Sequence, residues 1–119
     1  MSPLTRPSWK TIHERIEREP AFGAELLNVM FECLLKGEVG TGSAMLYDYI
    51  RATIGFEALG KLTSDSPDRL MQMFKSEDSL DAHTLFSVIH CLQQQAGLQL
   101  EVRAVAKQSQ PTQQAAISH

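Results

Sequence analysis

Hydrophobic residues recur at helical spacing through the first half of the chain and predict three helices. Residues 7–19 carry one apolar stripe, formed by Trp9, Ile12 and Ile16. A second helix is expected over residues 20–36, with a broad apolar face of Phe22, Leu26, Val29, Met30, Cys33 and Leu34. The glycine-rich stretch 37–43 is expected to form a loop, and residues 44–55 a third helix with Leu46, Ile50 and Ile54 at four-residue steps.

The pattern continues with three more helical segments. Residues 56–62 form a short amphipathic piece, and the polar residues 63–65 predict a turn. The next helix is expected over residues 66–74, because Ser66 can cap it and proline fits its first position. Asp81 is a suitable cap for a helix over residues 82–97, whose apolar stripe comprises Leu85, Val88, Ile89 and Leu92.

The end of the chain departs from the helical pattern. Residues 98–105 alternate apolar and polar side chains, which is typical of a half-buried strand. A lone strand leaves backbone groups unpaired on both edges, so we expect it to pair with the same strand of a second copy. Residues 106–119, rich in Gln and Ser, are expected to be disordered.

The predicted fold is therefore all-α, a compact domain of five or six helices with one short C-terminal β-strand that pairs across a homodimer. We expect three parts: an N-terminal helical arm at 1–19, the main domain at 20–105, and the tail at 106–119. Helix 20–36 is apolar around much of its circumference, which makes it a second candidate for the dimer contact.

Composition narrows the classes of function. The net charge is −3, so no global positive field indicates nucleic acid, although a local patch or a dimer can supply one. Cys33 and Cys91 lie among apolar residues, and buried thiols in a reducing compartment are the simplest interpretation. The first ten residues lack the apolar core of a signal peptide, and no apolar run is long enough to span a membrane. We expect a cytoplasmic protein without a membrane partner.

The most informative unit is the pair of short helices at 56–62 and 66–74. Two such helices joined by a short turn match the helix-turn-helix arrangement, and Gly60 lies where they must approach closely. A shared small core is expected from Leu59, Leu70 and Met73. A single helix fits the major groove of DNA, where side chains near its start can meet base edges. The residues predicted to contact DNA are Ser66, Arg69, Gln72 and Lys75.

Other candidate sites are weaker. His83, His90 and Cys91 share one helix, but no further pair of ligands completes a metal site, so we predict no metal and no cofactor. Cys33 has no orienting base near it in sequence, and no pair of carboxylates suggests acid–base catalysis, so we predict that the chain is not an enzyme. A small-molecule sensor with a pocket between the N-terminal helices and the rest stays a third hypothesis.

Five segments of the chain are distinctive: "REPAF", "LLKGEV", "DYIRATIGFEALGKLT", "SPDRLMQM" and "LQLEV". With them, residues 18 to about 105 resemble small bacterial regulators, the Cro/repressor-type helix-turn-helix proteins described as addiction-module antidotes, or antitoxin-like proteins. The resemblance implies a DNA-binding homodimer that represses transcription at an operator and is often encoded beside a toxin protein of the RelE/ParE-like class. It also places the start of the DNA-reading helix at Ser66.

Acidic residues crowd the same region and keep an alternative open. Residues 63–79 carry Asp65, Asp68, Glu77 and Asp78 against only Arg69 and Lys75. In addition, Asp81 and the acidic loop 77–81 would occupy the helix N–H groups that can hold a phosphate. The first hypothesis is a DNA-binding transcriptional regulator. The alternative is a protein-interaction module of the same fold, which binds a toxin or a sensor subunit and has weakened or lost DNA binding.

Overall fold

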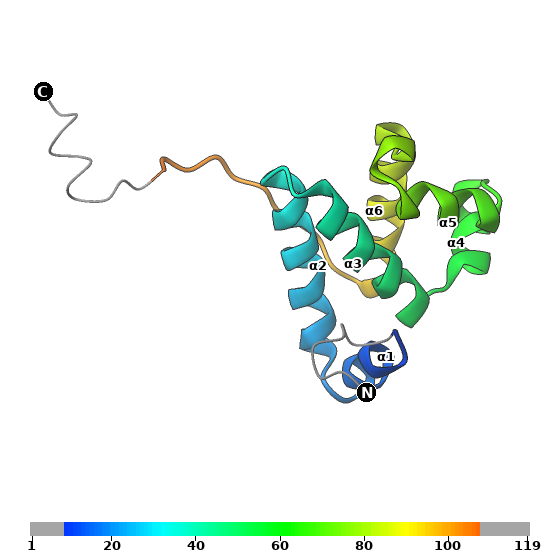
Figure 1. The fold of residues 1–119 in the computed structure, drawn as a ribbon. Helices are drawn as coiled ribbons and strands as arrows, with labels where there is room; N and C mark the ends of the chain where they lie inside the picture. The colour runs from blue at the N-terminus through cyan, green and yellow to red at the C-terminus, as the bar shows by residue number, and fades with distance from the viewer. Residues whose placement is uncertain (1–8, 108–119) are drawn as a thin grey trace, which may run out of the picture.

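The computed structural model describes residues 9–107, and this part of the chain is all-α (Figure 1). The helices are α1 (Trp9–Arg18), α2 (Pro20–Leu35), α3 (Val39–Ala52), α4 (Phe56–Thr63), α5 (Pro67–Lys75) and α6 (Ala82–Ala96). A short 3₁₀ turn, η1 (Glu77–Ser79), separates α5 from α6. No helix within residues 9–107 is both long and apolar enough to cross a membrane.

The core lies where α3 meets the other helices. α2 runs alongside α3, while α4 and α5 lie on the side of α3 away from α2 (Figure 1). The side chains that are most completely buried come from four different helices and share one core: Leu46, Ile50, Leu59, Leu70, Val88 and Leu92. Burial of an aliphatic side chain of this kind contributes about 1.5–3 kcal/mol, so this shared core holds the short helices in place.

The junction of α2 and α3 differs from the prediction. Residues 37–43 were expected to form a loop, but only the stretch between Leu35 and Val39 is non-helical. Gly37 ends α2 with a φ of +85°, and the N–H of Glu38 donates to the Cys33 carbonyl at 2.9 Å. A Cβ on Gly42 would lie 3.0 Å from Leu34 Cδ2. Glycine here serves the close packing of α3 on α2 rather than a loop, so the expected loop was wrong.

The predicted N-terminal arm packs against the main domain. The His13 ring nitrogen Nδ1 lies 2.8 Å from the Ala52 carbonyl oxygen, at the end of α3. The Arg51 guanidinium group lies 4.9 Å from the centre of the Trp9 ring, a distance at which a cation is attracted to the ring face. α1 is thus held against the C-terminal end of α3.

After α6 the chain turns at Gly97, whose φ is +68°, and continues without regular structure. The side chain of Leu100 enters a crevice between α2, α3 and α6, and its N–H donates to Gln93 Oε1 at 2.6 Å. The described part of the single chain contains no strand, so the strand expected at 98–105 and its pairing between two copies stay predictions. The predicted tail lies outside the described residues from position 108 onward.

Candidate nucleic-acid interface

The helical hairpin α4–α5 begins and turns through residues with unusual backbone conformations. Gly55 precedes α4 with a φ of +84°, which glycine adopts without strain. Ser64 ends α4 in the left-handed conformation, with a φ of +61°, and its N–H donates to the Gly60 carbonyl. The N–H of Asp65 donates to the same carbonyl at 2.9 Å. A turn joins the two helices, but it lies at residues 64–66 rather than at the predicted 63–65, because Thr63 still belongs to α4. A serine, Ser64, occupies the position that would suit glycine.

Gly60 sets the distance between the two helices. A Cβ at this position would lie 2.6 Å from the Asp65 carbonyl oxygen and 3.4 Å from Pro67 Cδ. Real Cβ atoms do not approach backbone atoms so closely, so only glycine fits here without displacing the turn. The close approach that the sequence predicts at Gly60 is confirmed.

α5 begins with a side-chain cap. Ser66 has an extended backbone, and its Oγ accepts a hydrogen bond from the N–H of Arg69 at 3.1 Å. Pro67 follows at the first helical position, where its missing N–H leaves no hydrogen bond unmade. The buried side of the hairpin is formed by Phe56, Leu59, Leu70, Met73 and Phe74. This core contains the three residues that the sequence predicts, together with the neighbouring rings of Phe56 and Phe74.

The four residues predicted to contact DNA are all exposed, and they lie on the outward side of the hairpin: Ser66, Arg69, Gln72 and Lys75. They do not form one uniform row. With 100° between successive helical residues, Arg69, Gln72 and Lys75 spread over about 120° of the α5 surface. Asp68, also exposed, falls between Gln72 and Lys75. A carboxylate therefore interrupts the surface that should approach a phosphate backbone.

The two cations of this surface already have partners. Arg69 Nη1 donates to Asp65 Oδ1 at 2.6 Å; the Asp65 side chain is only 17 % exposed, and that of Arg69 is 68 % exposed. Lys75 Nζ lies 5.8 Å from the centre of the Tyr47 ring on α3. Arg69 is thus held at the entrance of α5, whereas Lys75 leans toward α3.

The Asp65–Arg69 pair was not predicted from the sequence. The four-residue spacing of opposite charges was the available signal, since residues four apart on a helix face each other. Asp65, however, precedes the helix, where that rule does not apply directly. The contact forms because Ser64 and the cap at Ser66 turn the Asp65 side chain back toward Arg69.

The start of α6 carries the acidic cap that the sequence predicts. Asp81 Oδ2 accepts hydrogen bonds from the hydroxyl and the backbone N–H of Thr84, at 2.7 and 2.9 Å. These bonds, followed by the charges of His83 and Arg69, hold the pKa of Asp81 below its ordinary value. Asp81 is therefore ionised at neutral pH, and the N-terminal end of α6 is satisfied internally rather than open to a phosphate.

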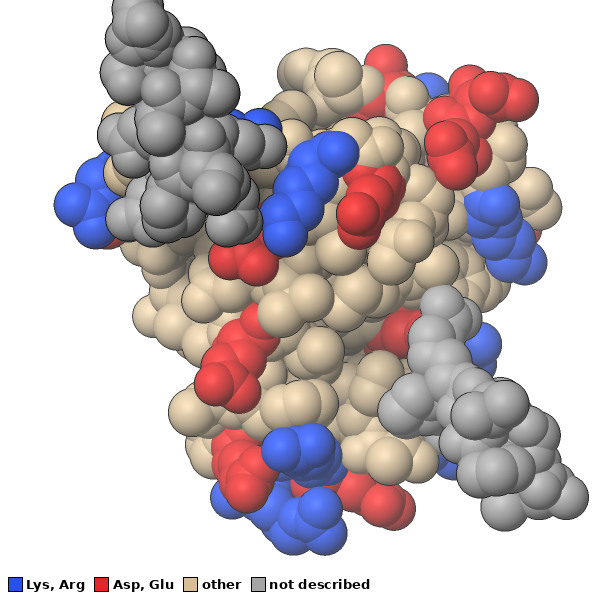
Figure 2. All heavy atoms as spheres, turned by 60° about the vertical axis from the view of Figure 1, so that its left-hand side comes forward, with Lys and Arg blue, Asp and Glu red and all other residues tan. Residues whose placement is uncertain are grey.

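Arg69 and Gln72 also border a small hollow of about 180 Å³ beside α6, together with Ser79 and Asp81. Elsewhere on the surface, charges of both signs are mixed. Figure 2 shows a face turned so that the side of α2 comes forward: basic and acidic side chains alternate there, with uncharged surface between them. No extended basic surface is visible on this face.

The described residues contain no group of three or more His, Cys, Asp or Glu side chains that could hold a metal ion. Cys33 and Cys91 are free thiols, both partly buried. Comparisons of the chain with protein-family models, with curated proteins and with solved structures found no match. The resemblance to antitoxin-like regulators therefore stays a prediction.

Proposed function

We propose that the chain is a DNA-binding transcriptional regulator that uses α4 and α5 as a helix-turn-helix, with α5 as the reading helix. The observation that carries this proposal is that the outward side of α5 presents exposed polar side chains. Ser66, Arg69 and Gln72 are exposed there, while Leu70 and Met73 fix the helix from beneath. A helix presented in this way can enter the major groove, where an arginine can donate two hydrogen bonds to a guanine.

The local charge limits how tightly such a regulator binds. The hairpin offers three cations per subunit, which are Lys61, Arg69 and Lys75, all exposed. A dimer would thus make roughly six phosphate or base contacts, and the slope of log K against log salt would be about −5 at most. The exposed carboxylate of Asp68 and the acidic turn η1 would repel the phosphate backbone and weaken these contacts. We therefore propose a specific regulator of modest affinity.

The test is a titration of the purified chain with the duplex DNA upstream of its own reading frame, repeated at increasing salt concentration. Binding at low salt that weakens as salt rises supports the proposal. Arg69→Ala should weaken binding by about 1–3 kcal/mol if the side chain meets a base edge. The absence of binding at low salt, or an Arg69→Ala variant that binds as well as the parent, would overturn it.

Asp68→Asn provides the matched charge test. Removing this exposed carboxylate from the outward side of α5 should increase affinity for any duplex, because one repulsion of the phosphate backbone is lost. Glu25→Gln makes the same change on α2, where Glu25 is also exposed. If the affinity for DNA rises equally in both variants, net charge alone is responsible. Such a result would not support α5 as the helix that contacts DNA.

A second candidate function is a protein-interaction module of the same fold, whose partner is a toxin or a sensor subunit. The observation that favours it is exposed apolar surface on α2 and the C-terminal segment, with Val29 44 %, Leu35 61 % and Val102 60 % exposed. Together with the acidic residues around α5, this surface suits a protein partner better than DNA.

This candidate is tested with the product of the adjacent reading frame. The two purified proteins should elute together in size-exclusion chromatography, and Val29→Glu with Leu35→Glu should separate them. Separate elution of the parent proteins would argue against the module.

A further inference from the structure

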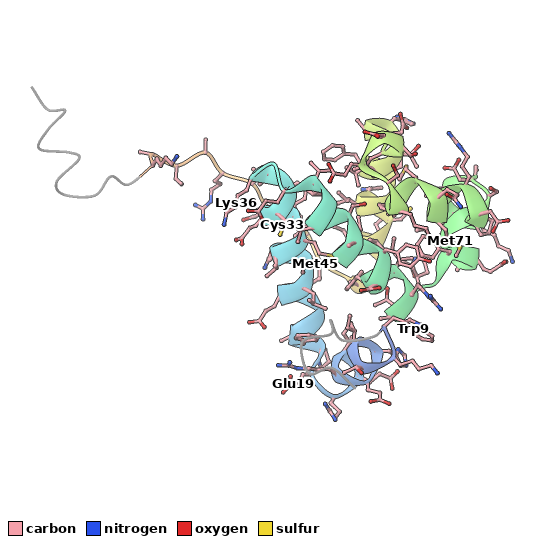
Figure 3. All side chains as sticks on the ribbon, in the orientation of Figure 1. Trp9, Glu19, Cys33, Lys36, Met45 and Met71 are labelled. Atoms are coloured by element: carbon pink, nitrogen blue, oxygen red, sulfur yellow. The ribbon has the colours of Figure 1, made fainter. Side chains whose placement is uncertain are left out.

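A cavity lies away from α4 and α5, between α1, α2 and the C-terminal ends of α3 and α6. Its volume is about 600 Å³, which is within the range of pockets that hold small molecules. α1 crosses over this region: Figure 3 shows Trp9 at its start, beside the end of α3, and Glu19 at the junction of α1 with α2.

The wall of this cavity is uncharged and mostly apolar, although Thr53 and Gln95 line it as well as Tyr49. Aliphatic side chains come from all sides, namely Ile16, Ile54, Leu92 and Leu98, and no Lys, Arg, Asp or Glu is among the lining residues. On α2 the lining residues are small, including Gly23 and Ala24. The space exists because these positions carry almost no side chain where α2 faces the end of α3. A charged ligand would find no counter-ion here, whereas a neutral one would lose little on entering.

One buried polar group in the wall has no partner among the described residues. Tyr49, on α3, is 4 % exposed and lines this cavity. Its carbonyl accepts from the Thr53 hydroxyl at 2.7 Å, but its own hydroxyl makes no hydrogen bond with any described residue. No fully buried side-chain oxygen in the described part of the chain lacks a partner. The Tyr49 hydroxyl must therefore reach an open space, and among the hollows described here Tyr49 lines only this cavity.

The hydroxyl is a hydrogen-bond donor at physiological pH. Burial raises the pKa of Tyr49 above its ordinary value, because the phenolate would lose its hydration. An O–H group in an apolar wall loses free energy unless it has an acceptor, so a molecule with an acceptor oxygen gains an interaction that the empty cavity lacks.

We propose that this cavity is a binding site for a neutral, largely apolar small molecule that carries a carbonyl or similar acceptor oxygen, which receives a hydrogen bond from the Tyr49 hydroxyl. The uncharged wall excludes an ionic ligand, the volume sets the size, and Tyr49 fixes the orientation. The site uses no residue of the proposed DNA-reading surface, so it can be tested independently of DNA binding.

The probe for the test is Nile red, a neutral apolar dye with a carbonyl acceptor, whose fluorescence rises in an apolar site. The full chain should bind it saturably, and more tightly than the anionic dye 1-anilinonaphthalene-8-sulfonate. Tyr49→Phe keeps the ring and removes only the hydroxyl, so it should weaken binding about fivefold, the value of one neutral hydrogen bond. Ala24→Leu, which fills the cavity from α2, should abolish binding.

The control for dye on exposed apolar surface is Leu35→Ser, because Leu35 is 61 % exposed and does not line the cavity. This variant should bind Nile red like the parent. Loss of binding with Leu35→Ser but not with Ala24→Leu would overturn the proposal.

Thermal unfolding without the dye separates binding from folding. Tyr49→Phe should keep or slightly raise Tm, since it removes a hydroxyl that has no partner. A clear fall in Tm would show that the hydroxyl is already bonded within the protein and would contradict the site. A chain without residues 1–8 should bind like the parent. If only the shortened chain binds, the cavity belongs to the protein's own N-terminus and the proposal fails.

Discussion

At the scale of single residues, the α4–α5 hairpin depends on one missing side chain. The carbonyl of Asp65 and the ring of Pro67 occupy the space where a Cβ of residue 60 would be. The turn cannot move outward without lengthening the hydrogen bonds that Ser64 and Asp65 make to the Gly60 carbonyl. Gly60 therefore couples the spacing of the two helices to the position of Arg69.

We expect Gly60→Ala to lower the free energy of unfolding by about 1–3 kcal/mol, because the added methyl group overpacks a backbone contact. Gly23→Ala is the matched control. It lies inside α2, where the new Cβ would meet Ile16 at an ordinary 3.7 Å. The higher helix propensity of alanine should stabilise that variant by about 0.5–1 kcal/mol. Urea denaturation of both variants measures the difference, and equal effects would contradict the account of Gly60.

At the scale of elements, periodicity predicted most helices but misplaced the start of α3. Glycine at positions 40 and 42 looks like a loop in sequence, yet both residues are helical. Helical glycine and loop glycine differ only in what approaches them, here the Leu34 side chain and the Met30 carbonyl at Gly42. Such contacts form only after α3 folds back on α2, so the pattern within residues 37–43 cannot reveal them.

The same limit applies to the candidate sites. The exposed residues of α5 followed from helical spacing alone, because one amphipathic helix determines which side faces outward. A pocket between the N-terminal helices and the rest was one hypothesis from the sequence, but its lining residues could not be named, because they come from four helices. In sequence, Tyr49 is only one of several core aromatic residues.

The start of α6 gives a prediction with a defined pH dependence. Because the folded-state pKa of Asp81 is depressed, its stabilising effect is present above the ordinary value of 3.8 and is lost as the pH falls through the lower folded pKa. Asp81→Ala should therefore lower Tm at pH 7, and the difference from the parent should shrink below about pH 4.

Asp81→Asn is the control for this prediction, since asparagine also accepts a hydrogen bond from the Thr84 N–H. It should lose less stability at pH 7 than the alanine variant. Circular dichroism melts across the acid range measure all three proteins. A Tm difference between parent and Asp81→Ala that stays constant down to pH 2 would show that the ionised carboxylate is not responsible.

At the scale of the whole molecule, α3 and α6 join the two proposed binding regions. Their N-terminal ends contact the α5–η1 region: the Ser43 hydroxyl donates to the Phe74 carbonyl at 3.0 Å, and Asp81 caps α6 beside Arg69. Their C-terminal ends line the cavity with Tyr49 and Leu92. The proposed DNA-reading surface on α5 and the cavity therefore lie near opposite ends of the same two helices.

The proposed homodimer depends on the segment after α6. Leu100 anchors this segment to the core, while Val102 and Val105 are 60 % and 80 % exposed. Among the described residues, the backbone of 101–107 makes no hydrogen bond, so it can pair with a second copy. A ribbon of two such segments would bury the exposed valines and satisfy these backbone groups together.

We expect Val102→Pro to convert the dimer to a monomer, because proline removes a backbone N–H from the pairing and restricts the strand conformation. Val102→Thr keeps that N–H and a β-branched side chain, so it should remain dimeric. Sedimentation equilibrium of the two variants beside the parent measures the mass directly. The anchor at Leu100 is untouched in both, so their helical content should match the parent. A parent chain that is monomeric would contradict the homodimer. A proline variant that keeps the mass of a dimer would exclude the C-terminal segment as the contact and favour the exposed side of α2 instead.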